Sequence, residues 1–188
     1  IVTKIMNPII TLIGGRNVGK SSILRSLCCT ELNQDLERSK PKIYLDFGGE
    51  RVLIFILSSS PQESTEYCNF DLVIGRLKKF IKKCEKKAEE EGVTQFLIII
   101  AFTLQVNRRG ELGKDCIINP LNFLKSLENY KTHVVHVNRD STRYDYRTNE
   151  FIKNTTSPDL ILESEETSKQ RQDENAKKLK EFLASLFH

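Results

Sequence analysis

The chain has 188 residues, of which 39% are hydrophobic and 29% charged, and this length suits one domain because a lone core stops growing at about 250–300 residues. The longest apolar run, residues 96–102, is much shorter than the roughly 20 residues of a membrane-spanning helix, so no transmembrane segment is predicted. The net charge of +4, from 29 basic and 25 acidic residues, is too small to indicate a nucleic-acid-binding protein. We therefore expect a single domain over residues 1–188.

The cysteines and histidines give no sign of a disulfide framework or a zinc site. The five cysteines are an odd number without C-x-x-C spacing, which favours reduced thiols in a cytoplasmic protein. His133 and His136 lie three residues apart on an expected strand, where alternation sends them to opposite faces. A shared metal ion is therefore not expected between them.

Hydrophobic patterning predicts strands and helices that alternate along the chain. A buried strand over 8–13 meets Gly14 and Gly15 and is followed by a helix from Ser22. Two strands then flank a glycine turn, and because so few residues join them they must pair antiparallel. These two strands are expected over 42–46 and 51–57. The elements expected after them are a helix to about 91, a strand over 95–104, a helix over 120–128, a strand over 132–137, at most a short helix within 139–154, a strand over 159–162 and a C-terminal helix.

This β-α-β rhythm predicts the α/β class. We expect three layers, with a mostly parallel six-stranded sheet that has one antiparallel strand and helices on both faces. Ligands of such sheets bind beyond the carboxyl ends of the parallel strands. The residues at those ends are Gly14, Ser58, Leu104, Asn138 and Glu163.

Residues 14–21 read Gly-Gly-Arg-Asn-Val-Gly-Lys-Ser, a complete G-x-x-x-x-G-K-[ST] pattern between a strand and a helix. Glycines allow the backbone N–H groups to approach a phosphate closely, and the helix N-terminus adds a partial positive charge. Lys20 is expected to meet the β- and γ-phosphates, and the Ser21 hydroxyl to bind Mg²⁺. The predicted phosphate-binding residues are Gly14, Gly15, Arg16, Asn17, Val18, Gly19, Lys20, Ser21 and Ser22.

With Asn-Val-Gly-Lys-Ser-Ser at 17–22, the sequence resembles the Ras-like and Era-like, translation-factor-related class of P-loop GTPases, and its element order agrees along nearly the whole chain. The resemblance implies the P-loop NTPase fold and a GTP-binding switch with Mg²⁺ as cofactor. It also implies that protein partners contact the switch-like loops 30–40 and 58–69. Ser39 resembles the switch threonine that meets Mg²⁺, and Gln62 or Glu63 would orient the attacking water.

The family's D-x-x-G motif is degenerate in this chain. Ser58 stands where the family has its metal-side Asp, and Pro61 where it has Gly, so we expect weak hydrolysis. Asp46 begins a literal D-x-x-G, but antiparallel pairing places its turn at the opposite end of the sheet from the phosphates. Asp46 is therefore interpreted as an ordinary turn residue.

The family's base-recognition motifs are also altered. Asn138-Arg139-Asp140 resembles N-K-x-D, with the acid one position early, so the choice between GTP and ATP stays open. Ser164, at the end of the last strand, resembles the final base contact and is equally suited to be a helix N-cap.

Two other functions remain as alternatives. Arg139, Arg143 and Arg147 have helical spacing near the expected ligand edge, as in the arginine-bearing lid of an ATP-dependent small-molecule kinase or ATPase. The missing metal-side carboxylate also fits a catalytically dead pseudo-GTPase that serves as an interaction module. The lysines at 78, 79, 82, 83, 86 and 87 are interpreted as a solvated helix face.

Overall fold

A computed structural model describes residues 6–28, 43–58, 70–104, 115–139, 143–164 and 168–187. Strands and helices alternate along it, as the hydrophobic pattern predicts. The elements are β1 (Asn7–Gly14), α1 (Lys20–Cys28), β2 (Ile43–Phe47), β3 (Glu50–Leu57), α2 (Phe70–Glu90), β4 (Phe96–Thr103), α3 (Asp115–Lys125), β5 (Tyr130–Asn138), α4 (Arg143–Thr156), β6 (Leu160–Glu163) and α5 (Lys169–Ser185).

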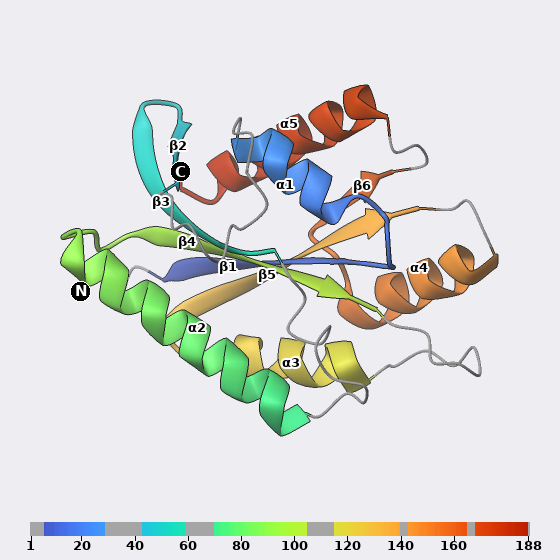
Figure 1. Cartoon of the computed structure of the whole chain (residues 1–188), viewed down its shortest axis with the longest axis horizontal. Helices are drawn as coiled ribbons and strands as arrows, with labels where there is room; N and C mark the ends of the chain where they lie inside the picture. The colour runs from blue at the N-terminus through green and yellow to red at the C-terminus, as the bar shows by residue number, and fades with distance from the viewer. Residues whose placement is uncertain are drawn as a thin grey trace.

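The strands form one six-stranded sheet in the order β2-β3-β4-β1-β5-β6 (Figure 1). Only β2 runs antiparallel to its neighbour, and the other four pairs are parallel. In register, Gly14 lies beside Thr103 of β4 and Val137 of β5. The predicted α/β fold class is confirmed.

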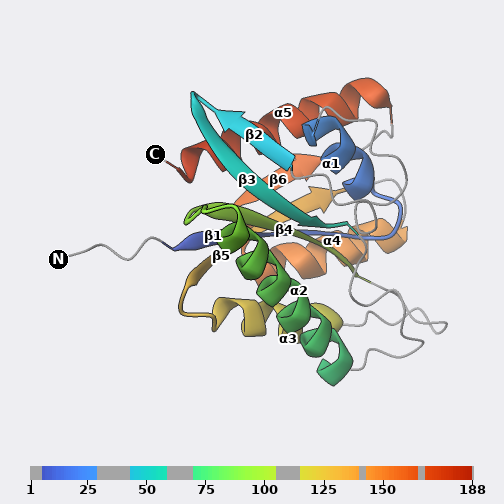
Figure 2. The ribbon, with the colours of Figure 1, turned by 60° about the vertical axis from the view of Figure 1, so that its left-hand side comes forward.

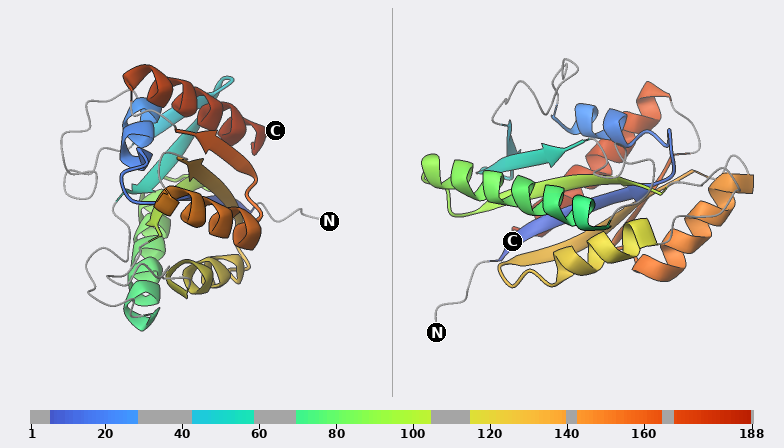
Figure 3. Two further views of the ribbon diagram at one scale, coloured as in Figure 1. Left: turned by 90° about the vertical axis from the view of Figure 1, so that its right-hand side faces the viewer. Right: turned by 60° about the horizontal axis from the view of Figure 1, so that its bottom comes forward.

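Helices cover both faces of the sheet. In Figure 1 α1 and α5 lie on one face, and α2, α3 and α4 on the other; the left-hand view of Figure 3 shows the same division. Each face has its own buried cluster, anchored by Leu24 and Leu179 on the first and by Leu77 and Leu121 on the second. All eight residues of β4 are buried, which explains why its sequence is a continuous apolar run.

The β2–β3 hairpin points away from the loop that joins β1 to α1 (Figure 2). Its turn is closed by Asp46, whose Oδ1 accepts a hydrogen bond from the Gly49 N–H at 2.7 Å. Asp46 is therefore the turn residue that antiparallel pairing predicts. Ser58 follows β3 directly, and the parallel pairing of β3 with β4 puts it at the carboxyl edge of the sheet.

Two helices differ most from the sequence expectations, α3 in its start and α4 in its length. The sequence predicts a helix over 120–128, but α3 begins at Asp115 and contains Pro120. Pro120 has no backbone N–H to donate to the carbonyl of Cys116, and the helix nevertheless continues through it to Lys125. The segment expected to hold at most a short helix forms α4, which has 14 residues.

Within the described ranges, no helix is long and apolar enough to cross a membrane. Cys28 and Cys84 are buried and take no part in a disulfide. The side chains of His133 and His136 contact elements on opposite faces of the sheet: His133 meets Phe182 of α5, and His136 meets Asn149 of α4. No cluster of three or more potential metal ligands occurs among the described residues.

Candidate functional site

The glycine-rich loop lies at the carboxyl edge of the sheet, where β1 ends and α1 begins (Figure 1). It is joined to the neighbouring strand end because the Leu104 N–H donates to the Gly14 carbonyl at 3.0 Å. The predicted strand, loop and helix order is therefore present, and the loop sits where ligands of parallel sheets bind.

Two glycines of the loop are required by its shape. A Cβ on Gly14 would come within 2.7 Å of Val18 Cγ2 and 2.9 Å of the Val137 carbonyl oxygen. Gly19 has a φ of +92°, and a Cβ there would lie 2.7 Å from Gln172 Nε2. Asn17 also has a positive φ, 59°, which Asn tolerates better than most residues.

Lys20 bends back over the loop that precedes it. Its Nζ donates to the carbonyl of Gly15 at 2.7 Å and to that of Gly14 at 3.2 Å, and the residue is only 7% exposed. Both of these acceptors are neutral carbonyl groups. The arrangement thus places an attractive positive charge at the base of the loop for an anion.

The loop's carbonyl groups are held by donors from the surrounding elements. Arg139 Nη1 donates to the Asn17 carbonyl at 2.9 Å, and Ser164 Oγ donates to the Val18 carbonyl at 2.8 Å. The Gly19 carbonyl accepts the first backbone bond of α1, from Ile23 at 2.9 Å. Every one of these three carbonyls is therefore engaged by the protein.

The N–H groups of the same loop are left without acceptors. Among the described residues, the backbone N–H groups of Asn17, Val18 and Gly19 donate to no protein atom. Successive free N–H groups at a helix N-terminus form a concave anion site. The first turn of α1 carries no acidic residue, so no carboxylate of that turn offsets the positive end of the helix, and Ser21 and Ser22 are exposed there.

A second polar group lies at the ends of β5 and β6. Asn138 and Glu163 are register partners, and Asn138 Nδ2 donates to Glu163 Oε2 at 2.6 Å. Behind them, Asn149 Nδ2 donates to the Arg139 carbonyl at 2.6 Å, and Asn149 Oδ1 is 3.2 Å from His136 Nε2. Burial lowers the pKa of His136, so its ring is neutral near pH 7 and its Nε2 carries the hydrogen.

Ser164 does not cap a helix. Ser168 is the N-cap of α5, where its side chain accepts from the Arg171 N–H, so the cap alternative for Ser164 is wrong. Ser164 is fully buried and donates to the loop, and its own N–H donates to the Asn138 carbonyl at 2.7 Å. The N-cap lies four residues after Ser164 because α5 begins only at Lys169, whereas β6 ends at Glu163.

Several predicted site residues lie outside the described residues. These are Ser39, Gln62, Glu63 and Asp140, together with the loops 30–40 and 59–69. Their roles stay predictions. Of the arginines proposed for a lid, Arg139 is held against the Asn17 carbonyl, and Arg147 is exposed on the regular helix α4.

Sequence reasoning placed Glu163 at the ligand edge without giving it a role, and it missed Asn149 and Gln172. Gln172 and Asn175 lie on the buried side of α5, in line with Ala176, Leu179 and Leu183. These two amides on an otherwise apolar stripe are the signal that could have found Gln172 and Asn175, because buried polar side chains need partners. Asn175 Nδ2 donates to the Glu163 carbonyl at 2.9 Å, which ties α5 to the end of β6.

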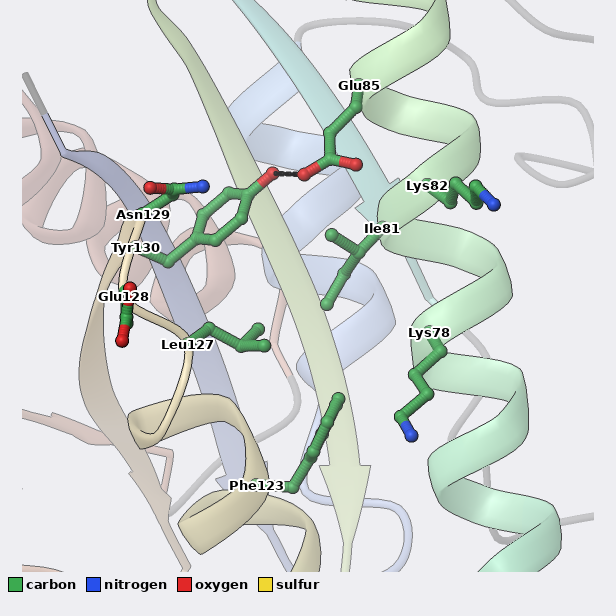
Figure 4. Close-up of a pocket in the computed structure, with 9 residues that line it drawn as sticks. All are labelled: Lys78, Ile81, Lys82, Glu85, Phe123, Leu127, Glu128, Asn129 and Tyr130. Carbon is green, nitrogen blue, oxygen red and sulfur yellow. Dashed lines mark hydrogen bonds between the residues drawn. The ribbon is translucent and has the colours of Figure 1, made fainter.

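A separate groove of about 270 Å³ lies between α2, α3 and the start of β5 (Figure 4). Figure 4 shows the Tyr130 ring reaching toward α2, where its hydroxyl donates to Glu85 Oε1 at 2.8 Å. Burial and this bond raise the pKa of Tyr130, so the phenol stays neutral. The groove has both lysines and glutamates at its rim and no cluster of reactive groups among its lining residues, so it does not compete with the glycine loop as a candidate site.

Comparisons with known proteins add one likeness. No protein-family model matches the sequence, and no curated protein matches it significantly. One similar solved structure is described as the crystal structure of a probable GTP-binding protein engB, with 14% sequence identity and a TM-score of 0.48. The likeness covers 95% of this chain and 97% of that chain.

Proposed function

We propose that the chain is a single nucleotide-binding domain that holds the phosphates of a purine nucleoside triphosphate, GTP foremost, on residues 14–22. The observation that carries this proposal is the asymmetry of the loop: its carbonyls are bound by protein donors, whereas the N–H groups of Asn17, Val18 and Gly19 have no acceptor among the residues that the structure describes. Such a cradle suits a phosphate and disfavours a cation. Lys20 supplies the full positive charge beside it.

Mg²⁺ fits this site as a metal that arrives with the triphosphate. The donors on the protein side are hydroxyls, with Ser21 exposed on the first turn of α1 and Ser58 following β3. Protein-bound Mg²⁺ commonly keeps several waters and leans on substrate phosphates, so few protein ligands are needed. When bound, the ion would neutralise part of the phosphate charge. Ser21 would supply an oxygen ligand to it, and Ser39 is a further proposed ligand.

The base is proposed to lie against the ends of β5 and β6. Asn138 stands at this edge with its amide oriented by Glu163, and Arg139 links the same segment to the phosphate loop through Asn17. Asp140 would accept hydrogen bonds from the N–H groups of guanine, so its shifted position reduces the margin of GTP over ATP. Ser164 is proposed to act at this edge through its hydrogen bond to the Val18 carbonyl of the phosphate loop.

Hydrolysis is proposed to be slow, with Gln62 or Glu63 orienting the water. Ser58 can bond a metal-bound water but brings no negative charge to the metal side. The kinase alternative receives no support from the described arginines, because Arg139 is engaged with the loop and Arg147 belongs to a regular helix. A switch-like domain with protein partners at loops 30–40 and 58–69 therefore remains the leading proposal.

Calorimetric titration of the wild-type protein and of Asn138→Ala with GTP and with ATP, each with Mg²⁺, tests the base assignment. We expect GTP to bind the wild type more tightly, and Asn138→Ala to weaken GTP binding by about tenfold while ATP changes little, since one amide contact to the base is worth about 1–1.5 kcal/mol. Lys153→Ala, an exposed lysine on α4, is the control. Equal losses for GTP and ATP, or a wild-type preference for ATP, would contradict guanine recognition by Asn138.

Ser58→Asp and Asp46→Ala test the metal-side assignment. We expect Ser58→Asp to tighten Mg²⁺-dependent GTP binding because it restores a carboxylate at the carboxyl edge of the sheet. Asp46→Ala removes only the turn bond to Gly49 and should change GTP affinity by less than about tenfold, or 1.4 kcal/mol. Titration of GTP with and without Mg²⁺ measures both effects, and a loss of Mg²⁺-dependent binding in Asp46→Ala would overturn the assignment.

A further inference from the structure

A buried polar contact connects the C-terminal helix α5 to the phosphate loop. Gln172 Nε2 donates to Ser164 Oγ at 3.3 Å, and Ser164 Oγ donates to the Val18 carbonyl at 2.8 Å. All three residues are buried, with Ser164 fully inaccessible and Gln172 4% exposed. Donors that are removed from water in this way are costly to bury unless they are used, so the chain of bonds fixes the positions of its members.

The same glutamine packs directly on the loop backbone. Its amide occupies the space that a Cβ on Gly19 would fill, with Nε2 at 2.7 Å and Cδ and Oε1 at 3.0 Å from that position. Gln172 Oε1 is buried and has no hydrogen-bond partner among the residues described. The Gln172 amide is thus linked to both residues of one peptide unit. It reaches the Val18 carbonyl indirectly through Ser164, and it packs directly against Gly19.

The hydrogen bond from Ser164 to the Val18 carbonyl also fixes the direction of the Gly19 N–H, because both groups belong to one peptide unit. The Val18–Gly19 peptide is planar and trans, so its C=O and N–H point in opposite directions. Since the Val18 carbonyl is turned toward Ser164, the Gly19 N–H is turned away from it. That N–H has no acceptor among the described residues.

We propose that Gln172 and Ser164 are positioning residues that hold the Gly19 N–H toward a bound phosphate, and that they couple the position of α5 to the nucleotide affinity of the loop. This inference rests on the proposed nucleotide binding. It makes α5 a regulatory element, because a displacement of the helix would withdraw Gln172 and free the Val18–Gly19 peptide to rotate. The helix is also bound to α1, since Ser26 Oγ donates to Asp173 Oδ1.

The test compares Ser164→Ala and Gln172→Met with a matched control. Each of the first two removes one link of the chain, and methionine keeps most of the volume of glutamine. Thr156→Val is the control, because the Thr156 hydroxyl is equally buried and donates to a backbone carbonyl, that of Ile152 at 2.7 Å, within α4. The dissociation constants for GTP and ATP with Mg²⁺ and the melting temperature are measured for all four proteins.

We expect Ser164→Ala and Gln172→Met to weaken GTP and ATP by the same factor, about tenfold, because both nucleotides share the phosphates. Thr156→Val should lower the melting temperature and leave both affinities unchanged. Melting temperatures that fall without any change in affinity would show a packing role only and overturn the inference, as would a loss confined to GTP, which would place Ser164 at the base. A wild-type protein that binds neither nucleotide would overturn the proposed function itself.

If Ser164→Ala does not fold, Gln172→Met decides the question alone, and the ¹H–¹⁵N signal of the Gly19 amide supplies a second readout. In the wild type this signal should shift when nucleotide is added. In Gln172→Met it should already differ before addition, because the peptide is no longer held. An unchanged Gly19 signal together with wild-type affinity would contradict the inference.

Discussion

Replacing Lys20 with alanine is expected to lower the affinity for Mg²⁺ and GTP by about 10- to 100-fold, the equivalent of about 1.5–3 kcal/mol for a charge-assisted hydrogen bond. The Nζ of Lys20 is buried against the Gly14 and Gly15 carbonyls, at the base of the loop in which the N–H groups of Asn17, Val18 and Gly19 have no acceptor within the described part of the chain. Its removal takes away the ammonium charge that we assign to the β- and γ-phosphates. Calorimetry with GTP measures the loss.

The control for Lys20 is Lys131→Ala, which removes an exposed lysine of β5 and tests whether net charge alone affects binding. We expect its affinity to match that of the wild type. Because Lys20 also bonds the loop, the melting temperature of Lys20→Ala is measured in parallel, and binding is compared below the melting range of both proteins. An unchanged affinity in folded Lys20→Ala would remove the assigned role of this residue.

Gly19→Ala is the second change with a large expected effect. We expect it to lower the free energy of unfolding by about 1–3 kcal/mol, since a side chain is strained at a φ of +92°. The added Cβ would also press on the buried amide of Gln172, which must move and release Ser164. Nucleotide affinity should therefore fall with stability. Urea unfolding and GTP titration measure the two effects.

Two control variants separate strain from contact in Gly19→Ala. Gly49 has a similar φ of +100° in the β2–β3 turn, but a Cβ there would meet nothing within 4 Å, so Gly49→Ala should show the strain alone with unchanged GTP affinity. Adding Gln172→Ala to Gly19→Ala should recover part of the stability, because the space for the Cβ is then open. If Gly19→Ala and Gly49→Ala show the same loss in free energy of unfolding and the same GTP affinity, the contact of Gly19 with Gln172 contributes nothing to either quantity.

The sequence predicted the fold well where the physics is local or topological. The apolar runs of β1 and β4 and the short link between β2 and β3 were sufficient to predict the sheet and its antiparallel strand. The same reasoning separated Asp46 from the phosphate edge although Asp46 matches a motif literally. The hydrophobic pattern gives the wrong start for α3: it predicts that the helix begins at Pro120, which lies inside the helix.

The site was predictable only as far as the loop pattern extends. The spacing of Gly14, Gly19 and Lys20 predicted a phosphate cradle, because those residues act through their own backbone and charge. The supports from Ser164 and Gln172 could not be predicted in the same way, since Ser164 lies 146 residues from the carbonyl it bonds. Long-range contacts of this kind depend on how α5 packs against the loop. That packing cannot be deduced from the pattern of a single sequence.

The most direct measurement of the central claim is a calorimetric titration of the wild-type protein with GTP in the presence of Mg²⁺. The asymmetry of the loop predicts saturable binding at one site per chain, and competition by a nucleotide with the same phosphates and a different base, ATP. The predicted result is one-site binding that weakens in Lys20→Ala. No detectable binding of either GTP or ATP at millimolar concentration would contradict the account.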